Sequence, residues 1–225
     1  MTGLVACVIP ALNAAGSVGA VVRGLRASVP QAIIIGVDDG SSDDTALVIG
    51  AQCDRALVFG RNRGKGAALR AGFAEALALH SDAVVALDAD GQHDPAYAPR
   101  LVAALDHADV VVGTRQRGVG DMPFRRRMTN ALSAAAARRL AGCELADPQS
   151  GFRAMRSAVV RAVNARGDRY EFETDFLLRA ARAGFRIAAV PIPTIYGPPS
   201  HFRQMRDGLR VVAIFCRHAW GGAVE

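Results

Sequence analysis

The sequence predicts an α/β fold built on a Rossmann-like, doubly wound, mostly parallel sheet with helices on both faces. Through the first 113 residues, short apolar runs alternate with longer segments of helical periodicity. The apolar runs are rich in valine and isoleucine, which is typical of strands buried on both faces of a parallel sheet. Right-handed crossovers between such strands place helices on both faces.

Length and composition fit one domain over residues 1–225. Of the 225 residues, 51% are hydrophobic and 21% are charged, as in ordinary globular proteins. The net charge of +6 comes almost entirely from arginine, because Lys65 is the only lysine. We do not interpret this total charge as nucleic-acid binding.

Cysteine usage and hydropathy indicate the compartment. The four cysteines, at positions 7, 53, 143 and 216, form no Cys-x-x-Cys pair and no zinc-ligand spacing, as expected in a reducing compartment. The apolar N-terminus lacks the basic region of a signal peptide and is better interpreted as a buried first strand. No apolar run reaches the roughly 18 residues of a membrane span. We therefore expect a cytoplasmic protein whose membrane contact is peripheral, at the inner face, or made through a partner, with homo-oligomerisation left open.

The first half of the chain supplies most of the regular pattern. Strands are expected at Leu4–Ile9, Ala32–Val37, Arg55–Phe59, Ala83–Leu87 and Asp109–Gly113, and helices at Ser17–Ser28, Gly64–His80 and Pro95–His107. Another helix is expected after Ser41 and Ser42, which we interpret as its N-cap, with Asp43 and Asp44 in its first turn. Proline suits the first turn of the helix that begins at Pro95.

Beyond residue 114 the alternation is less regular. An arginine-rich loop precedes an expected helix at Arg127–Ala141 and a turn at Asp147–Gly151. The pattern then predicts strands at Phe152–Met155 and Ile187–Val190, helices at Ala158–Asn164 and Glu173–Ala183, and a last helix from His201.

Three polar motifs follow predicted strands, at residues 10–13, 38–44 and 88–94. Ligands of an open parallel sheet bind beyond the carboxyl ends of its strands. Asp88, Asp90 and Gln92 occupy alternate positions, so an extended chain would place their side chains on one face. Two carboxylates and an amide oxygen suit Mg²⁺ or Mn²⁺. We predict a cation site that neutralises a diphosphate; the alternative is a polar loop with a capping aspartate before Pro95.

Asp38 and Asp39 also come directly after a buried strand. A carboxylate at this position can accept hydrogen bonds from a base N–H or from ribose hydroxyls. We therefore assign nucleoside binding to these two aspartates and helix capping to the residues that follow them.

The segment around Lys65 superficially resembles a P-loop. Gly60 and Gly64 are separated by three residues rather than four, and Gly66 replaces the Ser or Thr that would hold magnesium. We reject the P-loop. Two interpretations stay open, a helix N-terminus that faces a nucleotide together with Lys65, or plain surface charge at Arg61 and Arg63.

The densest basic stretch surrounds a single acid, Asp121. Its members are Arg115, Arg117, Arg125, Arg126 and Arg127. Guanidinium groups suit phosphate, so the target is a diphosphate, a second phosphorylated substrate or an anionic membrane surface.

Acidic residues gather near the helix predicted at Glu173. Favourable charge at a helix N-terminus explains Glu171, Glu173 and Asp175, and a general base is the competing role for one of them or for Asp147. His201, near the end of the chain, is a candidate metal ligand or phosphate contact. The alternative is a lone surface histidine without either role.

Four motifs, in order, make the chain resemble the family-2 glycosyltransferases. They are Val37–Asp43 (VDDGSSD), Asn62–Gly66 (NRGKG), Asp88–His93 (DADGQH) and Asp147–Arg153 (DPQSGFR). The resemblance covers about residues 4–210, and the branch it points to is the group of dolichyl-phosphate mannose synthases and bacterial polyprenyl-phosphate glycosyltransferases. It implies a GT-A fold and an inverting mechanism.

The resemblance and the residue patterns together define the candidate site. The candidate donor-binding residues are Pro10, Leu12, Asn13, Asp38, Asp39, Lys65, Asp88, Ala89 and Arg115. The candidate metal ligands are Asp88, Asp90 and Gln92. The candidate acceptor or phosphate contacts are Arg125, Arg126, Asn130, His201 and Arg203, and the catalytic candidates are Asp90, Asp147, Glu173 and Asp175. Two departures from the family pattern are Ala14, where an acidic residue is usual, and the segment Gly197–His201 (GPPSH), which replaces a Gly-Glu-Ser type segment.

We therefore expect an inverting hexosyltransferase of cell-envelope glycan biosynthesis. It would move a sugar from a nucleoside-diphosphate sugar, bound by residues 1–113, to a polyprenyl phosphate, bound by residues 114–225, in a direct displacement assisted by Mg²⁺ or Mn²⁺. The alternatives are a hydroxyl acceptor, which needs a carboxylate base, and a non-catalytic nucleotide-sugar-binding protein. A nucleotidyltransferase is disfavoured, because Pro10–Ala15 is not a loop rich in glycine and arginine.

Overall fold

The computed structural model describes residues 3–115, 147 and 150–193, and the statements below concern these residues. Their strands form one sheet in the order β3-β2-β1-β4-β6-β5-β7. The strands are β1 (Val5–Ala11), β2 (Ile33–Asp38), β3 (Arg55–Val58), β4 (Ala83–Ala86), β5 (Val110–Arg115), β6 (Arg153–Arg156) and β7 (Ile187–Ile192). Neighbouring strands are parallel except at β6, which runs antiparallel to both β4 and β5. The predicted mostly parallel sheet is confirmed.

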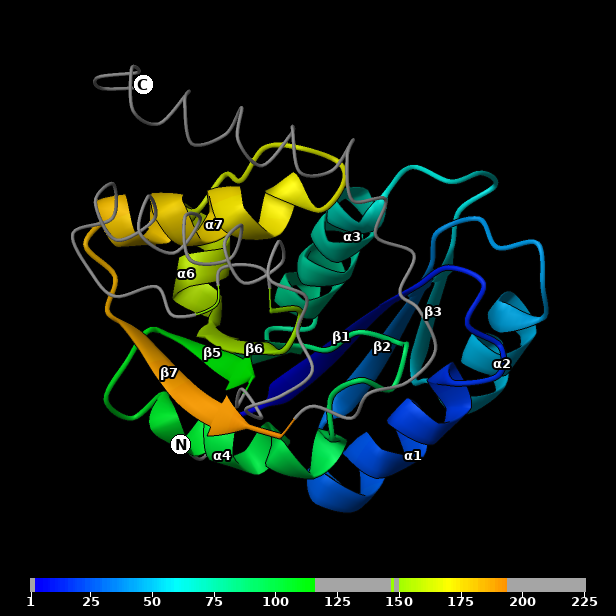
Figure 1. Cartoon of the computed structure of the whole chain (residues 1–225), viewed down its shortest axis with the longest axis horizontal. Coiled ribbons are helices and arrows are strands. Elements are labelled where there is room, and N and C mark those ends of the chain that lie inside the picture. The colour runs from blue at the N-terminus through cyan, green and yellow to red at the C-terminus, as the bar shows by residue number, and fades with distance from the viewer. Residues whose placement is uncertain (1–2, 116–146, 148–149, 194–225) are drawn as a thin grey trace, which may run out of the picture.

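Helices cover both faces of the sheet, as predicted (Figure 1). The α-helices are α1 (Val18–Ser28), α2 (Thr45–Gln52), α3 (Lys65–Ala78), α4 (Ala98–Ala104), α6 (Ser157–Ala162) and α7 (Glu171–Arg182). Side chains of α3, α6 and α7 share one apolar cluster with the sheet, and those of α1, α2 and α4 share the other. Within the described residues no helix is long and apolar enough to cross a membrane.

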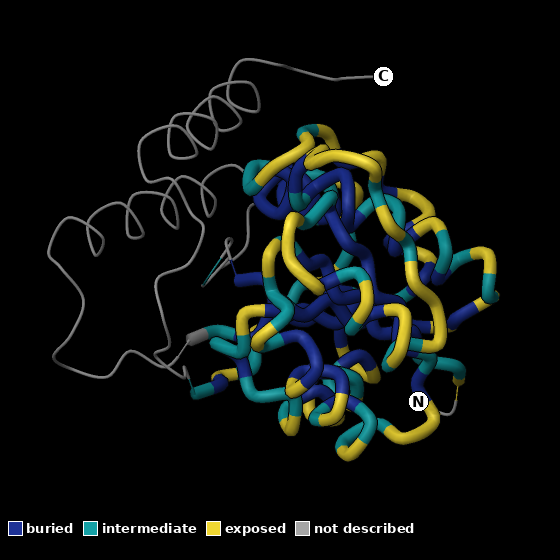
Figure 2. The backbone as a smooth tube through the Cα atoms, turned by 90° about the vertical axis from the view of Figure 1, so that its right-hand side faces the viewer, coloured by how far each residue is buried: buried dark blue, intermediate teal, exposed yellow. Residues whose placement is uncertain are grey.

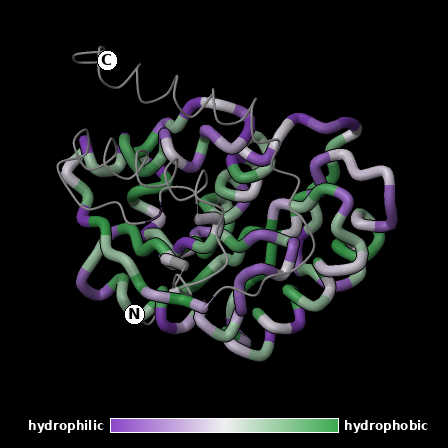
Figure 3. The backbone as a smooth tube through the Cα atoms, in the orientation of Figure 1, coloured by the Kyte–Doolittle hydropathy of each residue, from purple (hydrophilic) through white to green (hydrophobic). Residues whose placement is uncertain are grey.

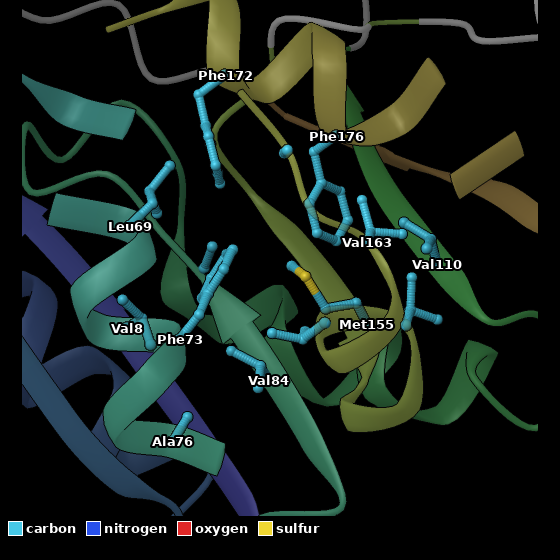
Figure 4. Close-up of a cluster of buried hydrophobic side chains, with 14 of the residues drawn as sticks. Val8, Leu69, Phe73, Ala76, Val84, Val110, Met155, Val163, Phe172 and Phe176 are labelled. Atoms are coloured by element: carbon cyan, nitrogen blue, oxygen red, sulfur yellow. The ribbon is translucent and has the colours of Figure 1, made fainter. Parts of the chain in front are cut away.

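The cluster beneath α3 and α7 fixes how these two helices meet. Phe73 of α3 lies 6.2 Å from Phe172 and 6.1 Å from Phe176 of α7, measured between ring centroids (Figure 4). Burial of large aromatic side chains is a main stabilising term of such contacts. Because both helices begin at the same side of this cluster, their first turns come together above the sheet (Figure 1).

The topology brings the three polar motifs to one edge. The chain passes outward from β1 to β2 and β3, then returns to β4 on the other side of β1. Strand pairing sets Ala11 beside Asp38, and Val8 beside Ala86. The carboxyl ends of β1, β2 and β4 therefore lie side by side at the switch point, where ligands of such sheets bind.

The central strand β4 is more deeply buried than the edge strand β3. All four residues of β4 are buried, whereas the edge strand β3 is largely exposed. Figure 2 shows buried backbone in the interior of the molecule and exposed backbone around it. Hydrophilic residues gather in the connecting loops (Figure 3). The residues that carry polar chemistry at the central strands are therefore those immediately beyond the strand ends.

Two local predictions were wrong. The helix expected over Pro95–His107 is a 3₁₀ turn, η1 (Pro95–Tyr97), followed by α4, and the Asp94 side chain accepts a hydrogen bond from Ala96 N at 2.9 Å. The expected capping by Ser41 and Ser42 fails because α2 begins only at Thr45. Ser41 Oγ accepts a hydrogen bond from Asn13 N, and Ser42 N donates one to Asn13 Oδ1. Both serines therefore join the loop after β2 to the loop after β1. The helices expected at Arg127–Ala141 and from His201 lie outside the described residues.

Candidate active site at the carboxyl edge of the sheet

The loop after β1 is fastened to the loop after β2. Asn13 N donates to Ser41 Oγ at 2.9 Å, and Asn13 Oδ1 accepts from Ser42 N at 2.9 Å. Ala14 N donates to Thr45 Oγ1 at 2.8 Å. Asn13 has a φ of 49°, which asparagine tolerates better than most residues. The Asn13 side chain therefore shapes the first loop of the candidate donor site.

Asp39 lies at the end of β2 and holds a third loop in place. Its Oδ1 accepts from Arg63 N at 2.7 Å and its Oδ2 from Gly64 N at 2.9 Å. Burial raises the pKa of Asp39 above its usual value, although the two N–H groups and Arg169 oppose this shift. The preceding Asp38 accepts hydrogen bonds from the backbone N–H and the hydroxyl of Ser41. Asp38 is thus bonded within its own loop, and Asp39 is bonded to the loop that precedes α3.

Two of the first N–H groups of α3 are already bonded within the protein. Gly66 N and Ala67 N both donate to the Asp168 carbonyl oxygen, at 2.8 and 3.2 Å. Gly64 stands at a φ of 104°, and a Cβ there would lie 2.2 Å from the same oxygen, so glycine is required. The segment before α7 therefore caps α3, and the Lys65 side chain is what this terminus contributes to the site.

Lys65 lies between two carboxylates from different elements. Its Nζ is 2.6 Å from Oδ1 of Asp88, which follows β4, and 3.1 Å from Oε1 of Glu173 on α7. The side chains of Lys65, Asp88 and Glu173 are 16%, 23% and 4% exposed. This ion pair joins residues 108 positions apart, counted from Lys65 to Glu173.

The charges of this cluster shift one another's pKa values. Burial alone would lower the pKa of Lys65, but attraction to Asp88 and Glu173 raises it above its usual value. Burial would raise the pKa of Asp88, but Lys65 lowers it overall. Burial raises the pKa of Glu173, against the opposing effect of Lys65 and Arg153.

Arg153 is a second buried cation, which was not among the predicted site residues. It is 3% exposed; its Nε donates to Ser150 O at 2.7 Å and its Nη1 donates to Glu173 O at 2.7 Å. Burial lowers the pKa of Arg153, and Glu173, Asp147 and Asp88 oppose that shift. The signal that could have revealed it is an arginine within the apolar stretch 152–155.

Asp90 is exposed beside this cluster. The segment that carries it does not stay extended as assumed, since it turns at Ala89 and Asp90 and passes through Gly91 at a φ of 74°. Asp90 Oδ1 accepts from Gln92 N at 3.0 Å. Desolvation raises the pKa of Asp90, and repulsion from Asp88 raises it further. The turn therefore brings Asp88 and Asp90 close together without an extended chain.

The donor chemistry at Asp88 and Asp90 fits a divalent cation. Both are hard oxygen ligands, and their mutual repulsion is the kind that a bound cation relieves. Among the described residues, no group of three His, Cys, Asp or Glu side chains is arranged to hold a metal by itself. A cation here would complete its coordination with ligands of other kinds, such as the Gln92 amide, diphosphate oxygens or water.

Asp175 is bonded to residues outside this cluster. It is fully buried, and its Oδ2 accepts from Arg179 Nε at 2.7 Å and from Arg166 N at 2.6 Å. These bonds tie the turn before α7 to the helix. Asp147, by contrast, lies near enough to Arg153 to affect its pKa.

The remaining candidates divide by what the structure describes. Pro10 and Ala89 are buried at the sheet edge, and Leu12 is partly buried. Arg115 is the last residue of β5, and its side chain is not among those described. Arg125, Arg126, Asn130, His201 and Arg203 lie outside the described residues, so their roles stay predictions.

Comparison with known proteins decides the family. Residues 6–163 match the model of Glycosyl transferase family 2. The chain belongs to glycosyltransferase family 2. The protein is accordingly a glycosyltransferase, and the resemblance stated from its motifs is confirmed.

Relatives of this family-2 member include enzymes named for polyprenyl phosphates. The chain is 35% identical to the undecaprenyl-phosphate mannosyltransferase of Micrococcus luteus, over 82% of this chain and 81% of the relative. It is 34% identical to the polyprenol monophosphomannose synthase of Mycolicibacterium smegmatis, over 82% and 75%. It is 30% identical to the UDP-N-acetylglucosamine–dolichyl-phosphate N-acetylglucosaminyltransferase of Methanococcus voltae, over 86% of each chain.

Solved structures show the same fold. Glucosyl-3-phosphoglycerate synthase from Mycobacterium tuberculosis, in complex with phosphoglyceric acid, superposes with a TM-score of 0.79 at 24% identity, over 99% of this chain and 82% of that one. The same enzyme has been crystallised with Mn²⁺ and UDP-glucose, with a TM-score of 0.79 at 23% identity, over 99% and 81%. The family-2 chain thus has the GT-A fold that the resemblance implies.

Proposed function

We propose that this glycosyltransferase moves a sugar from a nucleoside-diphosphate sugar to a polyprenyl phosphate, with inversion, in a single direct displacement. The observation that carries the proposal is the cluster of Lys65, Asp88, Glu173 and Arg153 beside the interlocked loops that follow β1 and β2. The names of the relatives, which specify polyprenyl phosphates, support the acceptor.

The donor would lie along the carboxyl edge of the sheet. The loops ordered by Asn13 and Asp39 would receive the nucleoside. Asp88 and Asp90, with Gln92, would hold Mg²⁺ or Mn²⁺, which when bound neutralises the charge of the departing diphosphate. Lys65, which contacts both Asp88 and Glu173 at this point of the edge, adds a positive charge beside the same leaving group.

The contacts of the acidic candidates favour an acceptor that needs no general base. A phosphate acceptor is already anionic. Glu173 is engaged by Lys65, and Asp175 by Arg179 and by Arg166 N, so both carboxylates already have partners within the protein. Asp147 remains the candidate base for a hydroxyl acceptor.

The acceptor phosphate would meet the basic residues of the second half. Arg115, Arg125, Arg126, Asn130, His201 and Arg203 carry this role in the proposal, and it rests on their sequence pattern alone. Because a polyprenyl phosphate resides in a membrane, we propose that the enzyme works at the cytoplasmic surface of one, by peripheral contact or through a partner.

The proposal is tested by a donor screen with a short polyprenyl phosphate as acceptor, following the release of nucleoside diphosphate. We expect one donor to support release only when both the polyprenyl phosphate and Mg²⁺ or Mn²⁺ are present. Turnover with saccharide hydroxyls and none with polyprenyl phosphate would replace the acceptor. Tight donor binding without turnover on any acceptor would indicate a non-catalytic binding protein.

Asp147→Asn separates the two acceptor classes. With a phosphate acceptor we expect kcat to change by less than about threefold, because no proton has to be removed. A loss of about 10²–10⁴-fold would identify Asp147 as a general base and support a hydroxyl acceptor. Thermal unfolding of the same variant shows whether the loss comes from the fold.

A further inference from the structure

The Lys65 ammonium is shared between the first proposed cation ligand and a residue of α7. It lies 2.6 Å from Asp88 Oδ1 and 3.1 Å from Glu173 Oε1, and all three side chains are largely buried. An ammonium is a compact charge with three donors on a flexible stem, so it can move between two acceptors by rotation of that stem. The ammonium contacts both carboxylates at once, so it can keep its contact with Glu173 when another cation binds Asp88.

Asp88 has little room to serve Lys65 and a divalent cation independently. Its Oδ1 accepts the ammonium, and its carboxylate packs against Gly151, where a Cβ would lie 2.2 Å from Oδ2. The carboxylate that contacts Lys65 is thus the same one that would ligate the cation. Two cations drawn to it repel each other, so each weakens the binding of the other.

Glu173 is positioned to hold the Lys65 ammonium when a cation occupies Asp88. Its side chain is 4% exposed, and its backbone carbonyl accepts a hydrogen bond from Arg153 Nη1 at 2.7 Å, which fixes this turn of α7 beside Asp88. The aromatic contact of Phe73 with Phe172 fixes the adjacent position of α7 against α3. These contacts hold the Glu173 carboxylate beside the Lys65 ammonium.

We propose that Lys65 competes with a divalent cation for Asp88, and that Glu173 is a positioning residue that draws the ammonium aside so that the cation can bind. This inference rests on the proposed cation site of the donor edge and adds residues that control its affinity. Lys65 and Glu173 then act in opposite directions, although neither is a ligand of the cation.

The test measures Mn²⁺ binding alone, without any nucleotide sugar, from the electron paramagnetic resonance signal of free Mn²⁺. Lys65→Met removes the competitor, and we expect Mn²⁺ to bind about tenfold more tightly, as removal of a nearby unit charge predicts even under water-like screening. Glu173→Gln leaves the ammonium to Asp88, and we expect Mn²⁺ to bind about tenfold more weakly. In the double variant, Glu173→Gln should change the affinity by less than about twofold, because its effect passes through Lys65.

Glu75→Gln is the matched control. Glu75 is a glutamate of the same helix as Lys65 and pairs with Arg55 at 3.4 Å near the surface. The same chemical change there should leave Mn²⁺ affinity unchanged. Unfolding curves for all variants confirm that each is folded at the temperature of the assay.

The outcomes separate this inference from the function it rests on. Absence of Mn²⁺ binding to the unmodified chain would overturn the cation site and this inference with it. Binding to the unmodified chain with equal affinity in Glu173→Gln would overturn the inference alone. If Lys65→Met does not fold, Glu173→Gln decides, because it keeps the Lys65–Asp88 pair. A Glu173→Gln effect that persists in the double variant would show direct attraction between Glu173 and the cation instead.

Discussion

Two pairs of aspartates at the same sheet edge are held in opposite ways. Asp38 and Asp39, after β2, accept hydrogen bonds from neutral groups, the backbone N–H of Ser41, Arg63 and Gly64 and the Ser41 hydroxyl. Asp88, after β4, is held by the charge of Lys65, and Asp90 is exposed and repelled by Asp88.

This difference distinguishes carboxylates that hold a loop in shape from carboxylates that can bind a cation. A carboxylate that accepts several backbone N–H groups fixes the shape of a loop, and its loss leaves those donors unsatisfied. A carboxylate that is held by a mobile ammonium keeps an electrostatic interaction that another cation can replace. We therefore expect substitutions at the first pair to act mainly on stability, and substitutions at the second pair to act mainly on activity.

The largest effect is expected from Asp88→Asn. It removes a proposed cation ligand and the partner of Lys65, while Glu173 still receives the ammonium. We expect kcat for nucleoside diphosphate release to fall by about 10²–10³-fold, as when one stabilising group of a developing charge is lost. Asp94→Asn, a few residues later at the cap of η1, is the control and should retain most of the activity. Comparable activity of Asp88→Asn and Asp94→Asn would contradict the distinction.

Asp39→Asn should lower stability more than it lowers activity. An amide nitrogen in place of one carboxylate oxygen would face the Arg63 or Gly64 N–H, which needs an acceptor. We expect the free energy of unfolding to fall by about 1–3 kcal/mol, measured by urea denaturation. At saturating donor, kcat should change less than in Asp88→Asn. An unchanged unfolding free energy would show that Asp39 does not hold its loop.

Gly151→Ala tests whether the position of the Asp88 carboxylate matters, without changing Asp88 itself. The added Cβ would lie 2.2 Å from Asp88 Oδ2 and push the carboxylate from its position. We expect about a tenfold loss of kcat/KM, in line with the cost of a small displacement of a positioned group. Gly50→Ala in α2 is the control, because a Cβ there meets nothing within 4 Å and alanine favours a helix. Equal activity of the two variants would show that Asp88 tolerates displacement.

The smallest effect is expected at the opposite edge of the sheet, at Asp54. Its Oδ1 lies 2.7 Å from Arg26 Nη2 and its Oδ2 accepts from Ile34 N at 2.7 Å. Burial would raise the pKa of Asp54, but the hydrogen bond from Arg26 and the Ile34 N–H lower it overall. Its contribution to stability is therefore present above the unfolded pKa, about 4, and is lost as pH falls through the folded value.

Asp54→Asn should accordingly destabilise the protein slightly at pH 7, with activity retained, and the difference from the unmodified chain should close as pH falls below about 4. Thermal unfolding across this pH range measures it. A stability difference that persists unchanged at low pH would show that the charge of Asp54 is not its source.

Much of this arrangement follows from local sequence patterns. The valine- and isoleucine-rich runs predicted β1, β2 and β4, and the rule for parallel sheets predicted that the motifs after them converge. The acidic residues after β2 and β4 were therefore expected near each other, as found. Their different modes of binding were not predicted, because the partners of Asp39 and Asp88 come from loops and helices that the local pattern does not connect.

The misses have more than one physical cause. The Lys65–Glu173 pair spans 108 positions, and periodicity within a helix or strand carries no information about such pairs. Ser41 looked like a capping residue, yet its hydroxyl donates to Asp38, because a short polar side chain can serve a loop as well as a helix end.

The most direct test of the central claim is calorimetric binding of a nucleoside diphosphate with and without Mn²⁺, in the unmodified chain, in Asp90→Asn and in Asp39→Asn. We expect Mn²⁺ to strengthen binding in the unmodified chain and in Asp39→Asn, and to have no effect in Asp90→Asn. If Mn²⁺ strengthens binding equally in Asp90→Asn, the cation is held elsewhere and the role assigned to the Asp88–Asp90 edge is wrong.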